Sequence, residues 1–367
     1  IKYYHMQDFC REMHFSRNAG PVHTPRPPGE EPWAGEAKAG GEDTIMCYKV
    51  LIPEAIHPRG MAFLLENGYE IRQGAGIEEE ALIREAQGCD AILTRNAVIS
   101  ERVMRASKQL KVVAMHGVGV DLIDVDAATR LGIQVVNAKD SNKLAVAEFT
   151  IGLMIALSRN VLLYDRELRK GNWQARRTLG MDLMGRTLGI VGMGAIGSLV
   201  AHKAVFGLEM QVIAHKRSIA GAKPMAGVSY TQNLDDVMAE ADFVSLHVPA
   251  TPETKQLIGR RELSLMKPDA FLINTARGEV VDHRALYEAL RDRKIAGAAL
   301  DVFPGEIPDP NDPLLTLDNV ILTPNAAAFT EQSVARMSLY AATGIHEVLS
   351  GQAPTRPVNT LLQAMFA

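Results

Sequence analysis

Short apolar runs alternate with helical stretches from Tyr48 onward. Apolar runs without polar alternation are typical of buried strands, and the first half has them at 49–52, 90–93 and 111–115. Between them, Met61–Asn67 has helical spacing and ends at Gly68, and Ser100 is placed to cap a helix that continues to Ser107. Strands separated by helices indicate parallel pairing, so the pattern predicts an α/β fold.

The second half repeats this alternation with stronger strands. A long helix at Leu144–Asn160 is apolar on nearly every face, which is typical of a helix packed on two sides. After it come six strand-like runs and a last helix at about Glu331–Ser350. The number of runs matches a doubly wound, dinucleotide-binding parallel sheet. The six runs are Thr187–Val191, Gln211–Ala214, Phe243–Leu246, Ala270–Asn274, Gly297–Leu300 and Val320–Leu322.

Residues 1–45 differ from the rest of the chain. They hold five prolines and five glycines and show no apolar periodicity, so they cannot bury enough apolar area to offset the entropy of ordering. The chain begins with Ile1, and Met46 stands directly before the first strand-like run. We therefore interpret residues 1–45 as a disordered or non-native extension.

Composition excludes several classes of protein. Hydrophobic residues make up 47% and charged residues 22%, as in an ordinary globular chain, and the net charge of −4 argues against nucleic acid as a partner. No apolar stretch is long enough to cross a membrane. Three cysteines without a CxxC pair fit neither a disulfide framework nor a zinc site, so we expect a cytoplasmic protein without a metal.

A glycine-rich turn stands at the start of the second half. Gly192, Gly194 and Gly197 have GxGxxG spacing, with a strand before them, a helix at Ser198–Phe206 after them and a second strand from Gln211. This context is typical of a turn that holds a pyrophosphate. The first glycine allows the tight turn, the second the close approach of backbone N–H groups, and the third close packing of helix on strand.

The end of the second strand indicates which dinucleotide binds. A cofactor with a free ribose 2′-hydroxyl is usually held there by an acidic residue, but the strand here ends in His215, Lys216, Arg217 and Ser218. Two cations and a hydroxyl suit a 2′-phosphate. We therefore expect NADP in preference to NAD; the alternative is that the cations form a solvated strand end.

Several motifs follow one another along the chain. Their joint order and spacing are more specific for a protein family than any single motif. From about Met46 to the C-terminus the chain resembles the D-isomer-specific 2-hydroxyacid dehydrogenases, which include phosphoglycerate dehydrogenase and hydroxypyruvate/glyoxylate reductase. The segments that carry the resemblance are His116–Asp124, Val146–Thr150, Gly192–Gly197, His247–Thr254, Leu272–Gly278, Ala299–Glu306 and Leu322–Asn325.

The resemblance implies two Rossmann-like domains with doubly wound parallel sheets. Residues 46–149 plus 329–367 would form a split substrate domain, residues 150–328 the dinucleotide-binding domain, and the cleft between them the active site. It also implies a homodimer built through the cofactor domains. The implied reaction is hydride transfer between NAD(P)H and a small 2-oxo or 2-hydroxy acid.

Reduction of a 2-oxo acid requires a cation beside the carboxylate and carbonyl, a hydride donor and a proton donor. Arg277 matches the family's catalytic arginine, and Gly117, Val118 and Gly119 can turn backbone N–H groups toward the same carboxylate. Glu306 matches the family's acid, which raises the pKa of a neighbouring histidine. The resemblance assigns further cofactor contacts to Val118, Ala195, Ile196, Val248, Pro249, Thr254, Thr275, Ala276, Arg277 and Asp301.

We expect substrate choice to depend on Thr94, Arg95, Asn96 and the loop around Trp173. Arg95 follows a strand that faces the cleft in the resemblance. It would contact a substrate phosphate or carboxylate, or else it is a solvated loop arginine.

One position departs from the family. The proton-donating histidine directly after Thr-Pro is Asn325 here, and asparagine cannot release a proton near neutral pH. Three explanations stay open: another donor or a substrate that needs less acid assistance, a change from an active parent, or a cofactor-binding sensor or interaction protein that no longer turns over. His116, beside the glycine turn, is a candidate substitute donor, whereas His247 and His283 are interpreted as structural or cofactor-side residues.

Overall fold

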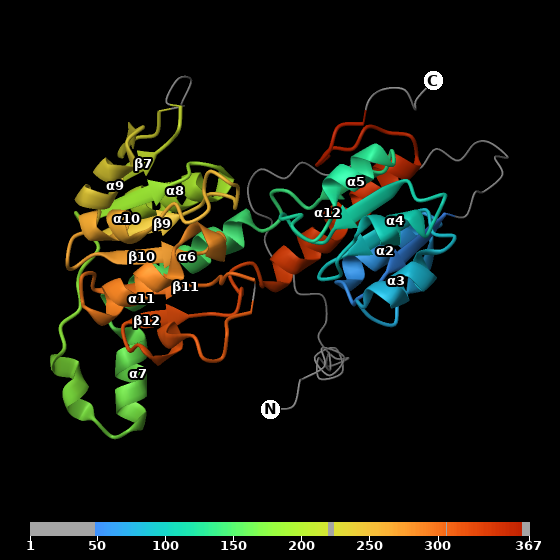
Figure 1. Ribbon diagram of the computed structural model, residues 1–367. Coiled ribbons are helices and arrows are strands. Elements are labelled where there is room, and N and C mark those ends of the chain that lie inside the picture. The colour runs from blue at the N-terminus through green and yellow to red at the C-terminus, as the bar shows by residue number, and fades with distance from the viewer. Residues whose placement is uncertain (1–47, 219–223, 306, 362–367) are drawn as a thin grey trace, which may run out of the picture. The chain divides into compact units, whose positions relative to one another are not determined.

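The computed structural model describes residues 48–218, 224–305 and 307–361 (Figure 1). The interpretation of residues 1–45 as an extension and the position of Glu306 lie outside these residues.

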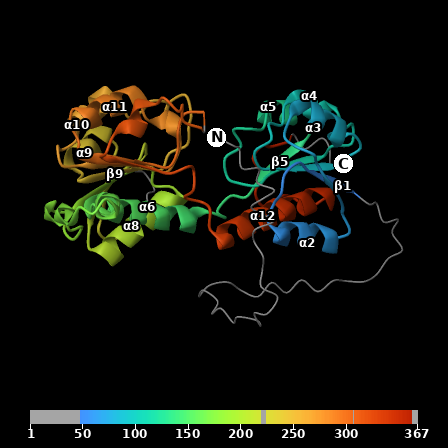
Figure 2. The ribbon, with the colours of Figure 1, turned by 90° about the horizontal axis from the view of Figure 1, so that it is seen from below.

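The first sheet has five parallel strands in the order β2-β1-β3-β4-β5. This is one of the two common orders of doubly wound sheets. Helices α3, α4 and α5 cover one face, and α2 and α12 cover the other (Figure 2). The strands are β1 (Lys49–Ile52), β2 (Glu70–Gln73), β3 (Ala91–Thr94), β4 (Val112–Met115) and β5 (Gln134–Asn137); the helices are α2 (Pro58–Glu66), α3 (Glu79–Ala86), α4 (Glu101–Arg105), α5 (Val125–Arg130) and α12 (Glu331–Leu349).

Burial on both faces explains why the strands of this sheet are continuous apolar runs. Val50 packs in the cluster that includes α12, and its neighbour Leu51 packs in the cluster on the opposite face; both are fully buried. The last segment of the chain also returns to this sheet. Asn359 accepts hydrogen bonds at Oδ1 from Gln134 Nε2 and from the Val135 backbone N–H, so it is joined directly to β5.

The second sheet has seven parallel strands in the order β12-β11-β10-β9-β6-β7-β8. Helices α6 and α8 cover one face, and α9, α10 and α11 cover the other (Figure 2). The strands are β6 (Thr187–Val191), β7 (Gln211–His215), β8 (Val228–Thr231), β9 (Phe243–Leu246), β10 (Phe271–Asn274), β11 (Gly297–Leu300) and β12 (Val320–Leu322). The helices are α6 (Lys143–Ser158), α7 (Val161–Arg169), α8 (Ala195–Leu208), α9 (Leu234–Glu240), α10 (Arg260–Leu265) and α11 (His283–Arg291), with short 3-10 turns η1 (Trp173–Arg177), η2 (Gly278–Val280) and η3 (Pro313–Thr316).

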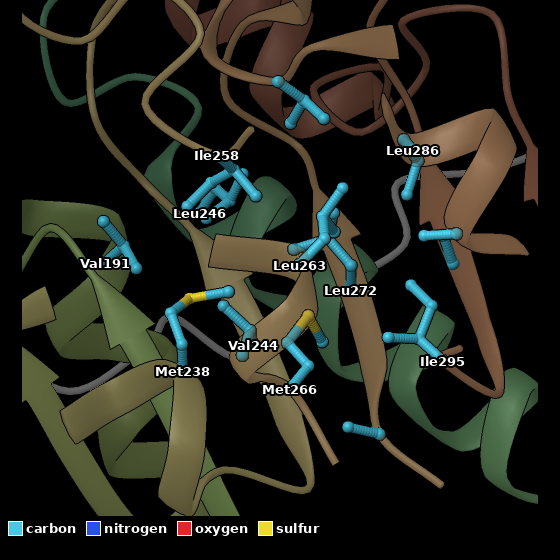
Figure 3. Close-up of a cluster of buried hydrophobic side chains, with 14 of the residues drawn as sticks. Val191, Met238, Val244, Leu246, Ile258, Leu263, Met266, Leu272, Leu286 and Ile295 are labelled. Atoms are coloured by element: carbon cyan, nitrogen blue, oxygen red, sulfur yellow. The ribbon is translucent and has the colours of Figure 1, made fainter. Parts of the chain in front are cut away.

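A large apolar cluster joins α9, α10 and α11 to the middle of this sheet. Met238, Leu263 and Leu286 come from the three helices and pack over Val244 and Leu272 of adjacent strands (Figure 3). These side chains are almost wholly buried, so the strand ends that they support are held in fixed positions.

The six predicted strands of the second half are all present, but the predicted number of strands in this sheet was wrong. The sheet contains a seventh strand, β8, at an edge next to β7. Its sequence is mostly polar, and each of its residues is at least partly exposed, so it has no apolar run to reveal it. Edge strand β2 was not predicted for the same reason, and β5 was also not predicted.

Two predicted helix boundaries shift because of local capping. Helix α2 begins at Pro58, since proline fits the first helical turn and the His57 ring accepts a hydrogen bond from Arg59 N–H. Helix α6 ends at Ser158, and the left-handed backbone of Asn160 (φ 51°) turns the chain into α7. The predicted cap at Ser100 is confirmed, because its Oγ accepts from Val103 N–H.

Among the described residues, no single helix is long and apolar enough to cross a membrane. Only α6 and α7 taken together pass that test, and they are bent by 60° relative to each other.

Candidate functional site

One pocket of about 470 Å³ is lined by residues that follow the carboxyl ends of strands in both sheets. From the first sheet, Arg95 follows β3 and His116 follows β4; from the second, His247, Arg277 and Asp301 follow β9, β10 and β11. Ligands of doubly wound folds bind at this edge, where successive parallel strands end. Parallel pairing therefore explains why residues far apart in the sequence meet here.

The turn after β10 fixes the backbone of Arg277. The buried Asn274 side chain donates to the Arg277 carbonyl oxygen (2.8 Å) and accepts from Ala276 N–H (3.0 Å). The Arg277 guanidinium donates to the Ala276 carbonyl oxygen and lies 3.5 Å from the Asp121 carboxylate. A Cβ on Gly119 would lie 2.1 Å from Arg277 Nη2, so any other residue here would displace the guanidinium from this position.

The glycine turn after β4 is held from both sides. His116 N–H donates to the Thr94 carbonyl oxygen (2.7 Å), and the Gly117 carbonyl oxygen accepts from Ala138 N–H (2.7 Å). The Asn137 side chain donates to the Val118 carbonyl oxygen (2.7 Å). Two of these three bonds use carbonyl groups of the turn, and together the three fix it beside the guanidinium of Arg277.

Asp301 organises the loop that carries Asn325. Its buried carboxylate accepts from the Thr323 hydroxyl and from Ala326 and Ala327 N–H, at 2.6–2.9 Å. Asn325 itself has a left-handed backbone (φ 52°), and its N–H donates to the Asp301 carbonyl oxygen. No hydrogen bond joins its side-chain amide to another described residue, so the amide remains available at the pocket lining.

Glu54 holds the loop that carries Arg95. Its carboxylate accepts from the backbone N–H groups of Arg95, Asn96 and Ala97 and from the Asn96 side chain. The Arg95 guanidinium lies 5.0 Å from the centre of the Phe329 ring, across the pocket lining. The arginine is therefore positioned from two directions.

The two histidines of the pocket are neutral at physiological pH. Burial lowers the pKa of His116 to about 4, and the charge of Arg95 acts in the same direction. Burial also lowers the pKa of His247 to about 4. The Nε2 atom of His247 is paired with Ser245 Oγ (2.9 Å), whereas Nε2 of His116 is buried without a hydrogen-bond partner among the described residues.

The glycine-rich turn after β6 fits a pyrophosphate. A Cβ on Gly192 would lie 2.6 Å from the His247 carbonyl oxygen, and one on Gly197 would lie 2.2 Å from the Gly192 carbonyl oxygen. Gly194 faces open space and caps α8 without a side chain, so the first N–H groups of the helix are left for a ligand. The residues present therefore fit a dinucleotide at this turn.

Lys216 and Arg217 stand at the end of β7. Lys216 N–H donates to the Thr231 carbonyl oxygen, and the Arg217 carbonyl oxygen accepts from Gln232, so the backbone is tied to the edge strand. Neither side chain forms an ion pair with another described residue. Burial lowers the pKa of the adjacent His215, and the charge of Arg217 contributes to that effect.

The structure brings most of the expected site residues together. Those that line the pocket are Arg95, Gly117, Val118, Gly119, Ile196, Val248, Pro249, Thr275, Ala276, Arg277, Asp301 and Asn325. The others lie outside its lining, on the β6–α8 turn, at the end of β7 and in the turn after β9: Gly192, Gly194, Ala195, Gly197, His215, Lys216, Arg217 and Thr254. The expectation for Glu306 lies outside the described residues.

Two residues that were expected to influence substrate choice are not among the residues that line the pocket. Trp173 is not part of the lining; it is 63% exposed on η1, and Thr94 is buried with its hydroxyl bonded to the Ala97 carbonyl oxygen. Asp121 and Glu54 were missed as positioning residues. Asp121 lies within the glycine motif and could have been found there, but the contacts of Glu54 span 41 residues or more and leave no local signal.

Comparison with known proteins gives a consistent set of relatives. The family model described as D-isomer specific 2-hydroxyacid dehydrogenase, NAD binding domain, matches residues 151–327. The chain is 41% identical over 315 residues to a D-3-phosphoglycerate dehydrogenase of Methanocaldococcus jannaschii, covering 85% of this chain but only 59% of that protein. It therefore spans about three-fifths of the length of such relatives.

Two further relatives are covered along nearly their whole length. A glyoxylate reductase of Korarchaeum cryptofilum is 39% identical over 323 residues, which are 86% of this chain and 96% of that protein. A solved structure of an acyclic imino acid reductase in complex with NADPH and D-Arg is 28% identical, with a TM-score of 0.76 over 85% of this chain and all of that one.

Proposed function

Because the chain belongs to the D-isomer specific 2-hydroxyacid dehydrogenase family, we propose that it is an NADP(H)-preferring reductase of a small 2-oxo acid. The observation that supports this most strongly is the position of Arg277. Its guanidinium lies beside the glycine turn Gly117–Gly119, at the edge where the strands of both sheets end.

The charges of the pocket support binding of a small carboxylate. The planar guanidinium of Arg277 can hold a carboxylate through two parallel hydrogen bonds and polarise the adjacent carbonyl. In this structure Asp121 lies at one side of that guanidinium, so a substrate carboxylate would take the remaining donors. Arg95, steadied by Glu54 and Phe329, adds a second positive charge for a further anionic group.

The dinucleotide would be held by the turn at Gly192–Gly197 and the first turn of α8, with Lys216 and Arg217 at the ribose end. When bound, it supplies the hydride. The apolar side chains of Val146, Ile196 and Val248 in the lining would limit water near the reacting carbon. The test is a spectrophotometric screen of NADPH and NADH oxidation with glyoxylate, hydroxypyruvate, other 2-oxo acids and 3-phosphohydroxypyruvate.

We expect Lys216→Asp combined with Arg217→Ala to reverse the preference for NADPH over NADH. The two cations would bind the 2′-phosphate, and each such charge-assisted bond contributes enough for about a tenfold change in affinity. Fluorescence titration with NADPH and with NADH measures the two affinities and therefore the preference. Arg105→Ala combined with Lys108→Asp makes an equal change of net charge at the end of α4 and in the turn after it, and it should leave the preference unchanged. Equal or tighter binding of NADH by the unaltered protein would contradict the proposal.

We also propose a homodimer whose interface includes the α7–η1 segment, residues 159–187. None of these residues is buried. Large apolar side chains such as Leu162, Leu168, Trp173 and Leu179 are 49–88% exposed. Large apolar side chains exposed along one segment favour an interaction surface, and a second copy of the chain is its proposed partner.

Trp173→Asp combined with Leu179→Asp should convert the dimer to a monomer, because each change places a charge in the proposed interface. Light scattering after size exclusion measures the mass. Leu65→Asp combined with Val98→Asp makes the same change at exposed positions of the first sheet's domain and should leave a dimer. A monomeric unaltered protein would overturn this proposal.

A further inference from the structure

Neither imidazole in the described part of the pocket is a charged proton donor at neutral pH. The carboxylates of Glu279 and Asp301 accept hydrogen bonds from the chain, and the Asp121 carboxylate lies 3.5 Å from the Arg277 guanidinium. The two imidazoles are neutral, since burial lowers the pKa of each to about 4. Asn325, on the loop that Asp301 organises, carries an amide that can donate a hydrogen bond but not a proton.

This set of groups is poorly matched to a ketone and well matched to an iminium ion. When hydride reaches the carbon of a C=O group, the π electron pair moves to oxygen and leaves an alkoxide that must be protonated. When hydride reaches the carbon of a C=NH₂⁺ group, the same pair moves to nitrogen and gives a neutral amine directly. No proton has to be transferred in the second case, and the amine later takes one from water.

We propose that the preferred acceptor of this pocket is the iminium form of a small 2-oxo acid, made by condensation of the oxo acid with ammonia or a primary amine and loss of water. The inference rests on the proposed function, because the reductant is again a reduced nicotinamide. The product is the corresponding 2-amino acid. Thus one C–H bond forms, the C–N π bond breaks, and the nicotinamide is oxidised by two electrons.

Hydrogen-bond acceptors are available for the iminium N–H groups. The Asn325 amide oxygen is unpaired among the described residues, and the unpartnered Nε2 of buried His116 offers a second polar atom in the same lining. The Asp121 carboxylate, beside Arg277, can balance the positive nitrogen while the guanidinium holds the substrate carboxylate. A 2-oxo acid offers no N–H group to these acceptors.

The test compares NADPH oxidation with 2-oxo acids in ammonium or methylammonium chloride and in trimethylammonium chloride, which cannot form an imine, at mildly alkaline pH. We expect the first two salts to raise the rate at least tenfold and chiral chromatography to show a 2-amino acid. Asn325→His should shift the product toward the hydroxy acid, whereas Asn325→Asp, which keeps an acceptor oxygen, should retain the amino acid product.

A binding measurement gives a readout independent of turnover. By calorimetry, D-alanine should bind the unaltered protein more tightly than D-lactate, and Asn325→His should reduce that difference. Reduction of oxo acids at the same rate in all three salts, with a hydroxy acid product, would overturn this inference and leave the proposed function standing. Absence of NADPH and NADH oxidation with every acceptor, with or without amine, would refute both.

Discussion

Asn325→His should raise turnover with a small 2-oxo acid by a factor of about 10² or more, the size of effect that general acid catalysis provides. The substitution places an imidazole at the family's proton-donor position. By the resemblance, Glu306 takes the place of the family's acid, which would favour the charged, proton-donating imidazole. Steady-state kinetics of both proteins with the same oxo acid measure the gain.

The backbone should accept this change. Asn325 has a φ of 52°, and histidine, like asparagine, is enriched among residues with left-handed backbones. The N–H bond to Asp301 does not involve the side chain and is retained. Cofactor affinity should change little, and the gain should fall as rising pH deprotonates the new histidine.

The same variant distinguishes a working reductase from the alternative function, a cofactor-binding sensor or interaction protein. If the pocket no longer serves turnover, Asn325→His will bind cofactor and remain inactive with every oxo acid tried. That result would remove the proposal of a 2-oxo acid reductase in its present form.

Arg277→Lys should lower kcat/KM by about 10²–10³, the loss typical of removing one electrostatic contact to the transition state. Lysine keeps the charge but not the planar fork that holds a carboxylate by two bonds. Stability should be nearly unaffected, because the Arg277 side chain is 39% exposed and its neighbour Asn274 bonds only to backbone atoms of this turn.

Gly119→Ala tests the position of Arg277 without removing it. The added methyl would lie 2.1 Å from Nη2, so the guanidinium must move, and kcat/KM should fall in the same direction. Arg284→Lys, at a side chain 88% exposed on α11, is the matched control and should retain full activity. Normal kinetics for both Arg277→Lys and Gly119→Ala would show that this arginine does not hold the substrate.

Local pattern was enough to predict the α/β class and the glycine turn, because these depend on apolar runs of buried strands and on glycine spacing. It failed where stability comes from distant partners. Strand β5 has only two apolar residues, and its buried Gln134 is paired with Asn359, 225 residues away. The arrangement of the pocket shows the same limit. The resemblance was enough to predict that Arg277 lines the pocket, but its contact with Asp121 and the Glu54 bonds behind Arg95 depend on the folded chain.

Because α12 and Asn359 return to the first sheet from the end of the chain, the two sheets are completed in a fixed order during synthesis. The seven-stranded sheet is encoded in one continuous stretch, from Thr187 to Leu322, whereas the face of β1, β3 and β4 that α12 covers stays open until residue 349 has been made. Contacts between segments so far apart in the sequence, such as β1 and α12, also form slowly. On the ribosome, the second sheet can therefore form first, while an apolar face of the first sheet remains exposed and prone to aggregation until α12 has been made.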